Sequence, residues 1–97
     1  MKRLRMQLQL LIDKAVEFGL PDDDIAFANE FLEPHEYNLC LDQIATQLYE
    51  YGIVIDDECY SIIRQLLASM NIPLTEYGFL RSYYKDSSMQ IDTPKNS

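Results

Sequence analysis

The sequence predicts an all-α fold, a small antiparallel bundle of four to five helices. Apolar residues recur at the three- and four-residue intervals of a helix face, and no segment shows the alternation of a half-buried strand. Glycine or proline follows the periodic segments, so short loops are expected to join the helices. With 97 residues and a hydrophobic content of 47%, the chain suits one folded domain with a modest core.

The first predicted helix covers residues 2–18 and ends at Gly19, because glycine readily adopts the left-handed conformation after a helix. Its apolar face consists of Leu4, Leu8, Leu11, Ile12, Ala15 and Phe18. Pro21 opens the second helix and Pro34 stops it. The buried stripe of this helix consists of Ile25, Ala28, Phe31 and Leu32.

A third helix is predicted over residues 36–51 and closes at Gly52. Its apolar stripe consists of Tyr37, Leu41, Ile44, Ala45, Leu48 and Tyr51. Asp56 is a good N-cap for a fourth helix that runs to residue 70 and is ended by Asn71 and Pro73. Its inward face consists of Tyr60, Ile63, Leu66, Leu67 and Met70. Residues 75–84 form a last short helix, weakened by Gly78.

The organisation of the chain favours a single cytoplasmic domain. We expect residues 1–85 to form the helical domain and residues 86–97 to be a disordered tail, because the tail offers little to bury. Polar residues interrupt the apolar stretch that a signal peptide would need after the basic N-terminus, and the apolar runs are too short for a membrane span. Cys40 and Cys59 lack C-x-x-C spacing and are expected to be free thiols in a reducing cytoplasm.

Negative charge is concentrated in residues 15–63, which hold twelve acidic residues, four tyrosines and no Lys or Arg. The net charge is −8, to which residues 1–14 contribute +3, residues 15–63 contribute −12 and residues 64–97 contribute +1. Such a field repels phosphate backbones and anionic membranes and attracts basic protein surfaces. We therefore expect a basic protein partner and no direct binding to nucleic acid or membrane.

The residue types give little support for catalysis, and we expect no enzyme, cofactor or metal site. His35 is the one histidine of the sequence, and a lone loop histidine is typically a solvated or capping residue. Neither acidic cluster, residues 22–24 or 56–58, has the alternating ligand spacing of a calcium loop. The three glycines are too scattered for a phosphate-binding loop.

Nine residues are candidates for partner binding. Tyrosine is enriched in binding hot spots because it offers a large contact area with a polar tip. A purely structural interpretation is also open. In that interpretation, one tyrosine of each neighbouring pair packs in the core, and the carboxylates at helix starts stabilise the helices through the helix dipole. The candidates are Asp22, Asp23, Asp24, Tyr49, Glu50, Tyr51, Asp56, Asp57 and Glu58.

Several segments within residues 10–70 resemble the MafI family of small immunity proteins. The segments are Gly19-Leu20-Pro21-Asp22-Asp23-Asp24-Ile25, Ala28-Asn29-Glu30-Phe31-Leu32-Glu33, His35-Glu36-Tyr37-Asn38-Leu39-Cys40-Leu41-Asp42, Gln47-Leu48-Tyr49-Glu50-Tyr51 and Ile53-Val54-Ile55-Asp56-Asp57-Glu58. The resemblance implies a cytoplasmic antitoxin of a bacterial competition system, of the MafB or contact-dependent growth-inhibition type. Such proteins bind the C-terminal toxic domain of a delivered effector, frequently an RNase of the EndoU class.

Two other functions fit the same sequence. An acidic adaptor, or a regulator that mimics nucleic acid, would bind a DNA-binding protein and would give no protection against a toxin. A small structural or oligomerisation module would self-associate. The three functions predict different partners: a toxin domain, a DNA-binding protein or a second copy of the chain. Identifying the protein with which the chain forms a complex would therefore distinguish them.

Overall fold

Four α-helices and one 3₁₀ segment make up the computed structural model, which describes residues 2–82. The helices are α1 (Lys2–Glu17), α2 (Asp22–Leu32), α3 (Tyr37–Glu50) and α4 (Asp57–Ser69), and the 3₁₀ segment is η1 (Leu74–Ser82). The predicted all-α fold is therefore confirmed. The predicted domain end at residue 85 and the predicted tail over residues 86–97 lie outside the described residues. Within residues 2–82, no helix is both long and apolar enough to cross a membrane.

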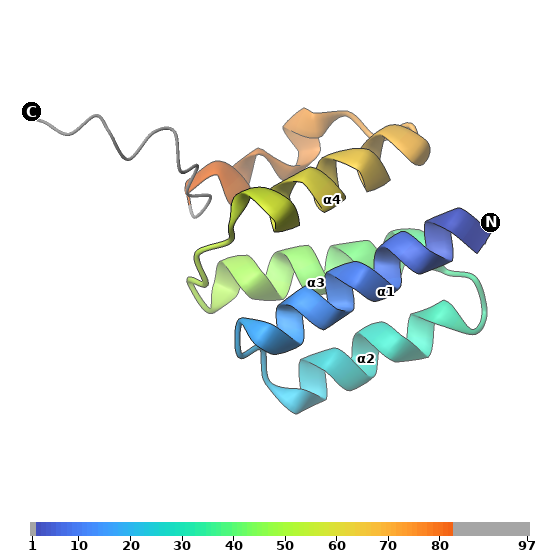
Figure 1. Cartoon of the computed structure of the whole chain (residues 1–97), viewed down its shortest axis with the longest axis horizontal. Coiled ribbons are helices and arrows are strands. Elements are labelled where there is room, and N and C mark those ends of the chain that lie inside the picture. The colour runs from blue at the N-terminus through green and yellow to red at the C-terminus, as the bar shows by residue number, and fades with distance from the viewer. Residues whose placement is uncertain (1, 83–97) are drawn as a thin grey trace, which may run out of the picture.

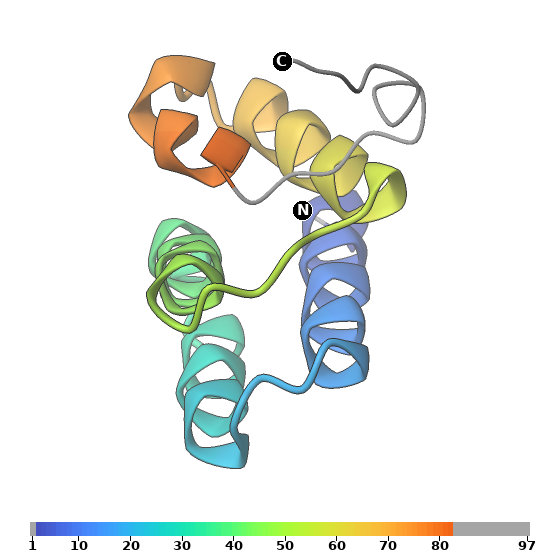
Figure 2. The same cartoon turned by 90° about the vertical axis from the view of Figure 1, so that its left-hand side faces the viewer.

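Successive helices run in opposite directions along the bundle (Figure 1). Helix α1 packs against α2, α3 and α4, and α2 packs against α3. Segment η1 covers α3 and α4. Figure 2, which looks along the helices, shows α1 on one side of the bundle and the α2–α3 pair on the other.

The core forms where the predicted apolar faces meet. From α1 to α4, the stripes read from the sequence supply most of its side chains, because a 3.6-residue period places them on one side of each helix. Fully buried positions include Leu8, Leu11, Ala15, Ala28, Cys40, Leu41, Ile44, Leu48, Ile55, Cys59, Ile63 and Leu66.

All four α-helices end in the same backbone motif. At the end of α1, the Gly19 N–H donates to the Val16 carbonyl and the Leu20 N–H donates to the Ala15 carbonyl, both at 3.0 Å. This paired pattern requires a left-handed residue just after the helix. Gly19 (φ 90°) and Gly52 (φ 65°) hold that position for α1 and α3, as predicted, whereas His35 (φ 60°) and Asn71 (φ 58°) hold it for α2 and α4.

Two local expectations need correction. Pro21 does not open α2; its extended ψ of 149° places it one residue before the helix, where its carbonyl accepts the first backbone bonds. Tyr51 does not continue the buried stripe of α3, because the helix ends at Glu50 and the Tyr51 side chain is 53% exposed. The predicted last short helix is present as the 3₁₀ segment η1, which is kinked at Tyr77.

Candidate partner-binding surface

Asp24 connects the beginning of α2 to the end of α3. Its side chain is 8% exposed, and its Oδ1 accepts hydrogen bonds from Gln47 Nε2 at 2.9 Å and from Gln43 Nε2 at 3.3 Å. Asp22 and Asp23, two positions and one position earlier, are exposed. The predicted acidic cluster is therefore divided: one carboxylate joins two helices, and the other two face solvent.

Tyr51 lies beside the same carboxylate. The negative charge of Asp24 raises the pKa of the Tyr51 hydroxyl, because a phenolate there would be repelled, and the hydrogen bond between these two side chains acts in the same direction. The structure thus brings together Asp24 and Tyr51, two residues that the sequence placed in separate candidate groups. The Asp24 carboxylate therefore interacts with an exposed aromatic side chain that follows α3.

Two further apolar side chains are exposed on α2 and α3. Phe27, one turn after Asp24, is 54% exposed, and Leu39, one turn before Gln43, is 48% exposed. Glu50 is also exposed and lies three turns after Leu39 on the same side of α3. We call this surface, formed by Asp23, Phe27, Leu39, Glu50 and Tyr51, the α2–α3 face.

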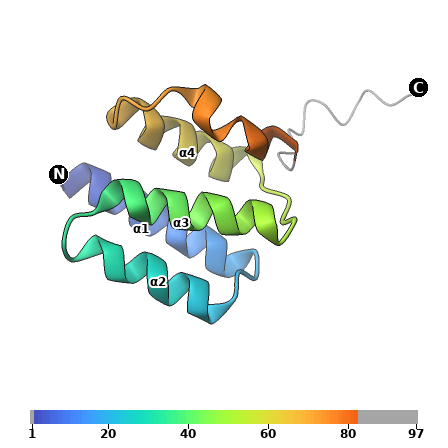
Figure 3. The same ribbon diagram turned by 180° about the vertical axis from the view of Figure 1, so that it is seen from behind.

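The α2–α3 face is bounded by η1 on the far side of α3. The Tyr77 hydroxyl donates to Asp42 Oδ1 at 3.1 Å, and the rings of Tyr49 and Phe79 meet edge to face with centroids 5.1 Å apart. Burial and the Asp42 charge raise the pKa of Tyr77 to about 12. Figure 3 shows α3 in front of α1, with α2 on one side and η1 on the other. Tyr49 is therefore half covered, at 38% exposed.

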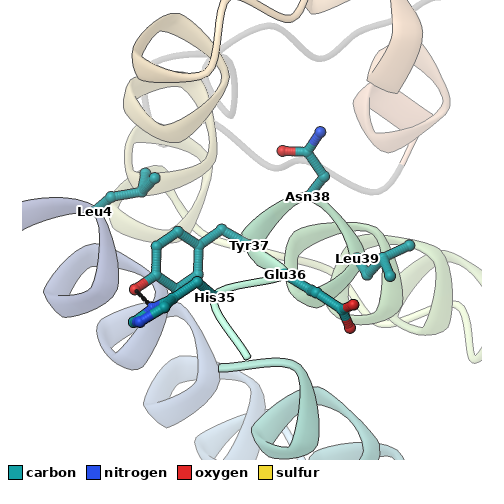
Figure 4. Close-up of a pocket in the computed structure, with 6 residues that line it drawn as sticks. All are labelled: Leu4, His35, Glu36, Tyr37, Asn38 and Leu39. Atoms are coloured by element: carbon teal, nitrogen blue, oxygen red, sulfur yellow. Dashed lines mark hydrogen bonds between the residues drawn. The ribbon is translucent and has the colours of Figure 1, made fainter. Parts of the chain in front are cut away.

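An open pocket of about 370 Å³ adjoins Leu39 at the turn between α2 and α3. Its lining consists of Leu4, His35, Glu36, Tyr37, Asn38 and Leu39. The His35 Nδ1 atom lies 2.9 Å from the Tyr37 hydroxyl, and Figure 4 shows Leu4 on one side of this pair and Leu39 on the other. The predicted role of His35 as an exposed loop residue agrees with its position after α2.

The second acidic cluster is occupied by a lysine from α1. The Lys14 ammonium lies 3.0 Å from Asp56 Oδ2 and 3.2 Å from Glu58 Oε1, and the Lys14 side chain is 12% exposed. The hydrogen bond to Asp56 raises the pKa of Lys14, so the lysine stays charged. Asp56 also caps α4, as predicted, since its Oδ1 accepts from the Cys59 N–H at 2.8 Å. Part of the charge of this cluster is therefore neutralised within the chain.

Sequence reasoning missed Phe27 and Leu39 as surface residues and Lys14 as the partner of Asp56. The sequence does hold an indication for the first two, because both are apolar and fall outside the helical stripes of their segments. It holds none for Lys14, which is 42 residues from Asp56. Asp57, which neighbours this ion pair, is exposed.

The two cysteines are buried free thiols, as predicted. Burial raises the pKa of Cys40 to about 11 and that of Cys59 to about 12. Both thiols are therefore protonated near neutral pH, whereas a nucleophilic cysteine needs a lowered pKa.

Comparison of the chain with protein-family models, with curated proteins and with solved structures gives no match.

Proposed function

We propose that this chain is an immunity protein that binds and neutralises a basic nuclease toxin domain in the cytoplasm. The observation that carries the proposal is the α2–α3 face, where Phe27, Leu39 and Tyr51 are exposed within a segment that contains no Lys or Arg. The resemblance of residues 10–70 to MafI immunity proteins supports the choice of a toxin, with an EndoU-class RNase as the first candidate.

The face combines the two features that tight recognition of a basic protein needs. Exposed aromatic and aliphatic side chains can enter pockets of the partner and supply most of the binding energy. The surrounding carboxylates, Asp22, Asp23 and Glu50, attract Lys and Arg, which speeds encounter and orients the two proteins. The face therefore offers both apolar contacts and long-range attraction.

A ribonuclease presents cationic side chains around its cleft because its substrate is a polyanion. An acidic protein that covers this cleft competes with RNA for the same charges. Inhibition then requires only steric and electrostatic blockade, and no group of the immunity protein reacts. Asp56 and Glu58 contribute less in this arrangement than sequence reasoning suggests, because Lys14 already occupies them.

The test uses the toxin domain encoded next to this chain, co-expressed with the full chain in bacteria. We expect a complex on gel filtration, restored growth, and an affinity that falls at least tenfold for Leu39→Ser or Tyr51→Ala. Leu10→Ser is the matched control, since Leu10 is exposed to a similar degree on α1 and lies outside the α2–α3 face. Association should also slow as salt is raised, because screening weakens steering.

Two results would overturn the proposal. Absence of both a complex and growth protection with the neighbouring domain would remove the immunity function. Capture of a transcription factor, with derepression of its promoter, would favour the acidic regulator instead. Equal loss of affinity for Leu39→Ser and Leu10→Ser would keep a complex but move the interface away from the α2–α3 face.

A further inference from the structure

The outer side of α1 carries a row of exposed residues that lies outside the α2–α3 face. Arg3, Met6, Leu10, Asp13 and Glu17 follow one another at intervals of three, four, three and four residues, which is the spacing of a helix-pairing seam. All five residues are exposed, Met6 by 63% and Leu10 by 53%. We call this row the α1 seam.

The α1 seam faces away from the core of the bundle. The opposite side of α1 is buried through Leu8, Leu11, Ile12 and Ala15. Figure 2 shows α1 at the side of the bundle, with no other described helix beyond it. Helix α1 lies in front of α3 in Figure 1 and behind it in Figure 3, so the helix that carries the seam and helix α3 lie on opposite sides of the bundle.

The charges at the two ends of the seam have opposite signs. Arg3 lies at its beginning, and Asp13 and Glu17 lie at its end. When two such helices pair antiparallel around Leu10, Arg3 of each copy lies opposite Glu17 of the other, and Leu10 meets Leu10. Parallel pairing would instead place Arg3 against Arg3 and Glu17 against Glu17, which is repulsive. The seam is therefore complementary to itself in one orientation.

Whole-chain electrostatics favour the same face. A net charge of −8 opposes self-association through most surfaces, and residues 15–63 alone contribute −12. Residues 1–14, which form most of α1, contribute +3. When two copies meet through α1, the surfaces that come together carry the least negative charge, so the repulsion between the copies is smallest there. Their acidic α2–α3 faces then point away from each other.

We propose that the α1 seam is a self-association surface through which two copies of this chain form a two-fold, antiparallel α1–α1 dimer. Leu10 forms the apolar centre of the interface, and Met6 lies one turn from it on the same row. Helix α1 has 16 residues and is about 24 Å long. The area buried between two helices of this length is small compared with the roughly 1,200 Å² of a stable interface. The dimer is consequently weak and depends on concentration.

Sedimentation of the full chain from about 1 μM to about 1 mM tests the dimer directly. We expect the average mass to rise from the 11.3 kDa of one chain toward twice that value. Glu17→Arg should weaken association at least tenfold, because it places two arginines opposite each other. The double variant Arg3→Glu/Glu17→Arg should restore it, since the pair is reversed. Glu30→Arg on α2 is the control with the same change in net charge.

Leu10→Ser separates a central apolar contact from a general surface effect. This variant should abolish the rise in mass, whereas Leu39→Ser on the α2–α3 face should leave it intact. A mass of one chain throughout the concentration range would overturn the proposal, as would a double variant that associates no better than Glu17→Arg alone. Circular dichroism of each variant checks that the helices are retained. None of these measurements involves a toxin, so the dimer is tested independently of the proposed function.

Discussion

Lys14 of α1 and Asp56, the residue that caps α4, form an ion pair with 3.0 Å between Nζ and Oδ2. The pair connects the end of the first helix to the beginning of the fourth across 42 residues of sequence. Asp56 thereby satisfies a backbone N–H of its own helix and a charge on another helix. One side chain stabilises both the secondary structure and the packing of α1 against α4.

Replacement of Asp56 by Ala should destabilise the fold by about 1–2 kcal/mol, because it removes an N-cap and a partly exposed ion pair together. Urea unfolding followed by circular dichroism measures this loss. Glu30→Ala, at an exposed position of α2, should change the free energy of unfolding by less than about 0.5 kcal/mol. Equal effects of the two substitutions would show that the cap and the ion pair contribute little.

The contribution of the Asp56 charge to the free energy of unfolding should disappear in acid. Burial by itself raises the pKa of this carboxyl, but the Cys59 N–H and the Lys14 ammonium outweigh it and hold the pKa below its usual value. The folded state therefore gains stability above the unfolded pKa, near 4, and loses it as the pH falls through the folded value. Asp56→Asn retains the cap without the charge. Its deficit in unfolding free energy should be present at about pH 7 and vanish in strong acid.

Neutralising Asp24 should lower the pKa of Tyr51. The Asp24 charge raises that pKa in the native chain, so phenolate formation at Tyr51 should begin at lower pH in Asp24→Asn. Ultraviolet titration, with Tyr51→Phe subtracted to isolate one of the seven tyrosines, gives the measurement. A Tyr51 titration that is the same in both proteins would contradict the contact between these side chains.

Leu39 and Leu41 are two residues apart on α3, but their truncation should change the stability of the fold by very different amounts. Leu41 is 0% exposed, and Leu41→Ala should cost about 2–5 kcal/mol of stability through a lost contact and a cavity. Leu39 is 48% exposed, and Leu39→Ala should change the free energy of unfolding by less than about 0.5 kcal/mol. Thermal unfolding distinguishes the two, and only Leu39→Ala can then be used to test partner binding without loss of fold.

The thiols of Cys40 and Cys59 should be inert in the folded chain. Both side chains are buried, and burial raises their pKa to about 11 and about 12, so thiolate is scarce near neutral pH. Reaction with a colorimetric disulfide reagent should be slow in buffer and should consume both thiols in denaturant. Rapid reaction in buffer would indicate that α3 or α4 opens locally.

The helices could be predicted from the sequence because periodicity, caps and helix-ending residues act over a few neighbours. The structure moves their ends by only a residue or two, and the Asp56 cap lies where the sequence predicts it. The buried stripes are equally local, since every third or fourth residue faces the same way. The exposure of Tyr51 is the exception, and its cause is that α3 ends just before it.

The surface could be predicted only in part, because it depends on which helices become neighbours. Nothing near Asp24 in the sequence indicates that this acid lies against Gln43 and Gln47, whereas Asp22 and Asp23 face solvent. The same holds for Asp56, whose charge is balanced by a lysine from another helix. Acidic residues that look equivalent along the chain therefore differ in how much charge they present to a partner.

The single lysine between residues 3 and 84, Lys14, has its amine engaged with Asp56 and Glu58. Reagents that attack free amines will therefore modify this chain mainly near its two ends and leave the α2–α3 face unlabelled. The protein can be attached to a sensor surface through these amines without modifying residues 15–84. Because residues 15–63 contain no Lys or Arg, trypsin releases residues 15–64 as one fragment. Footprinting of the α2–α3 face therefore calls for carboxylate-directed reagents or for a protease that cuts at acidic residues.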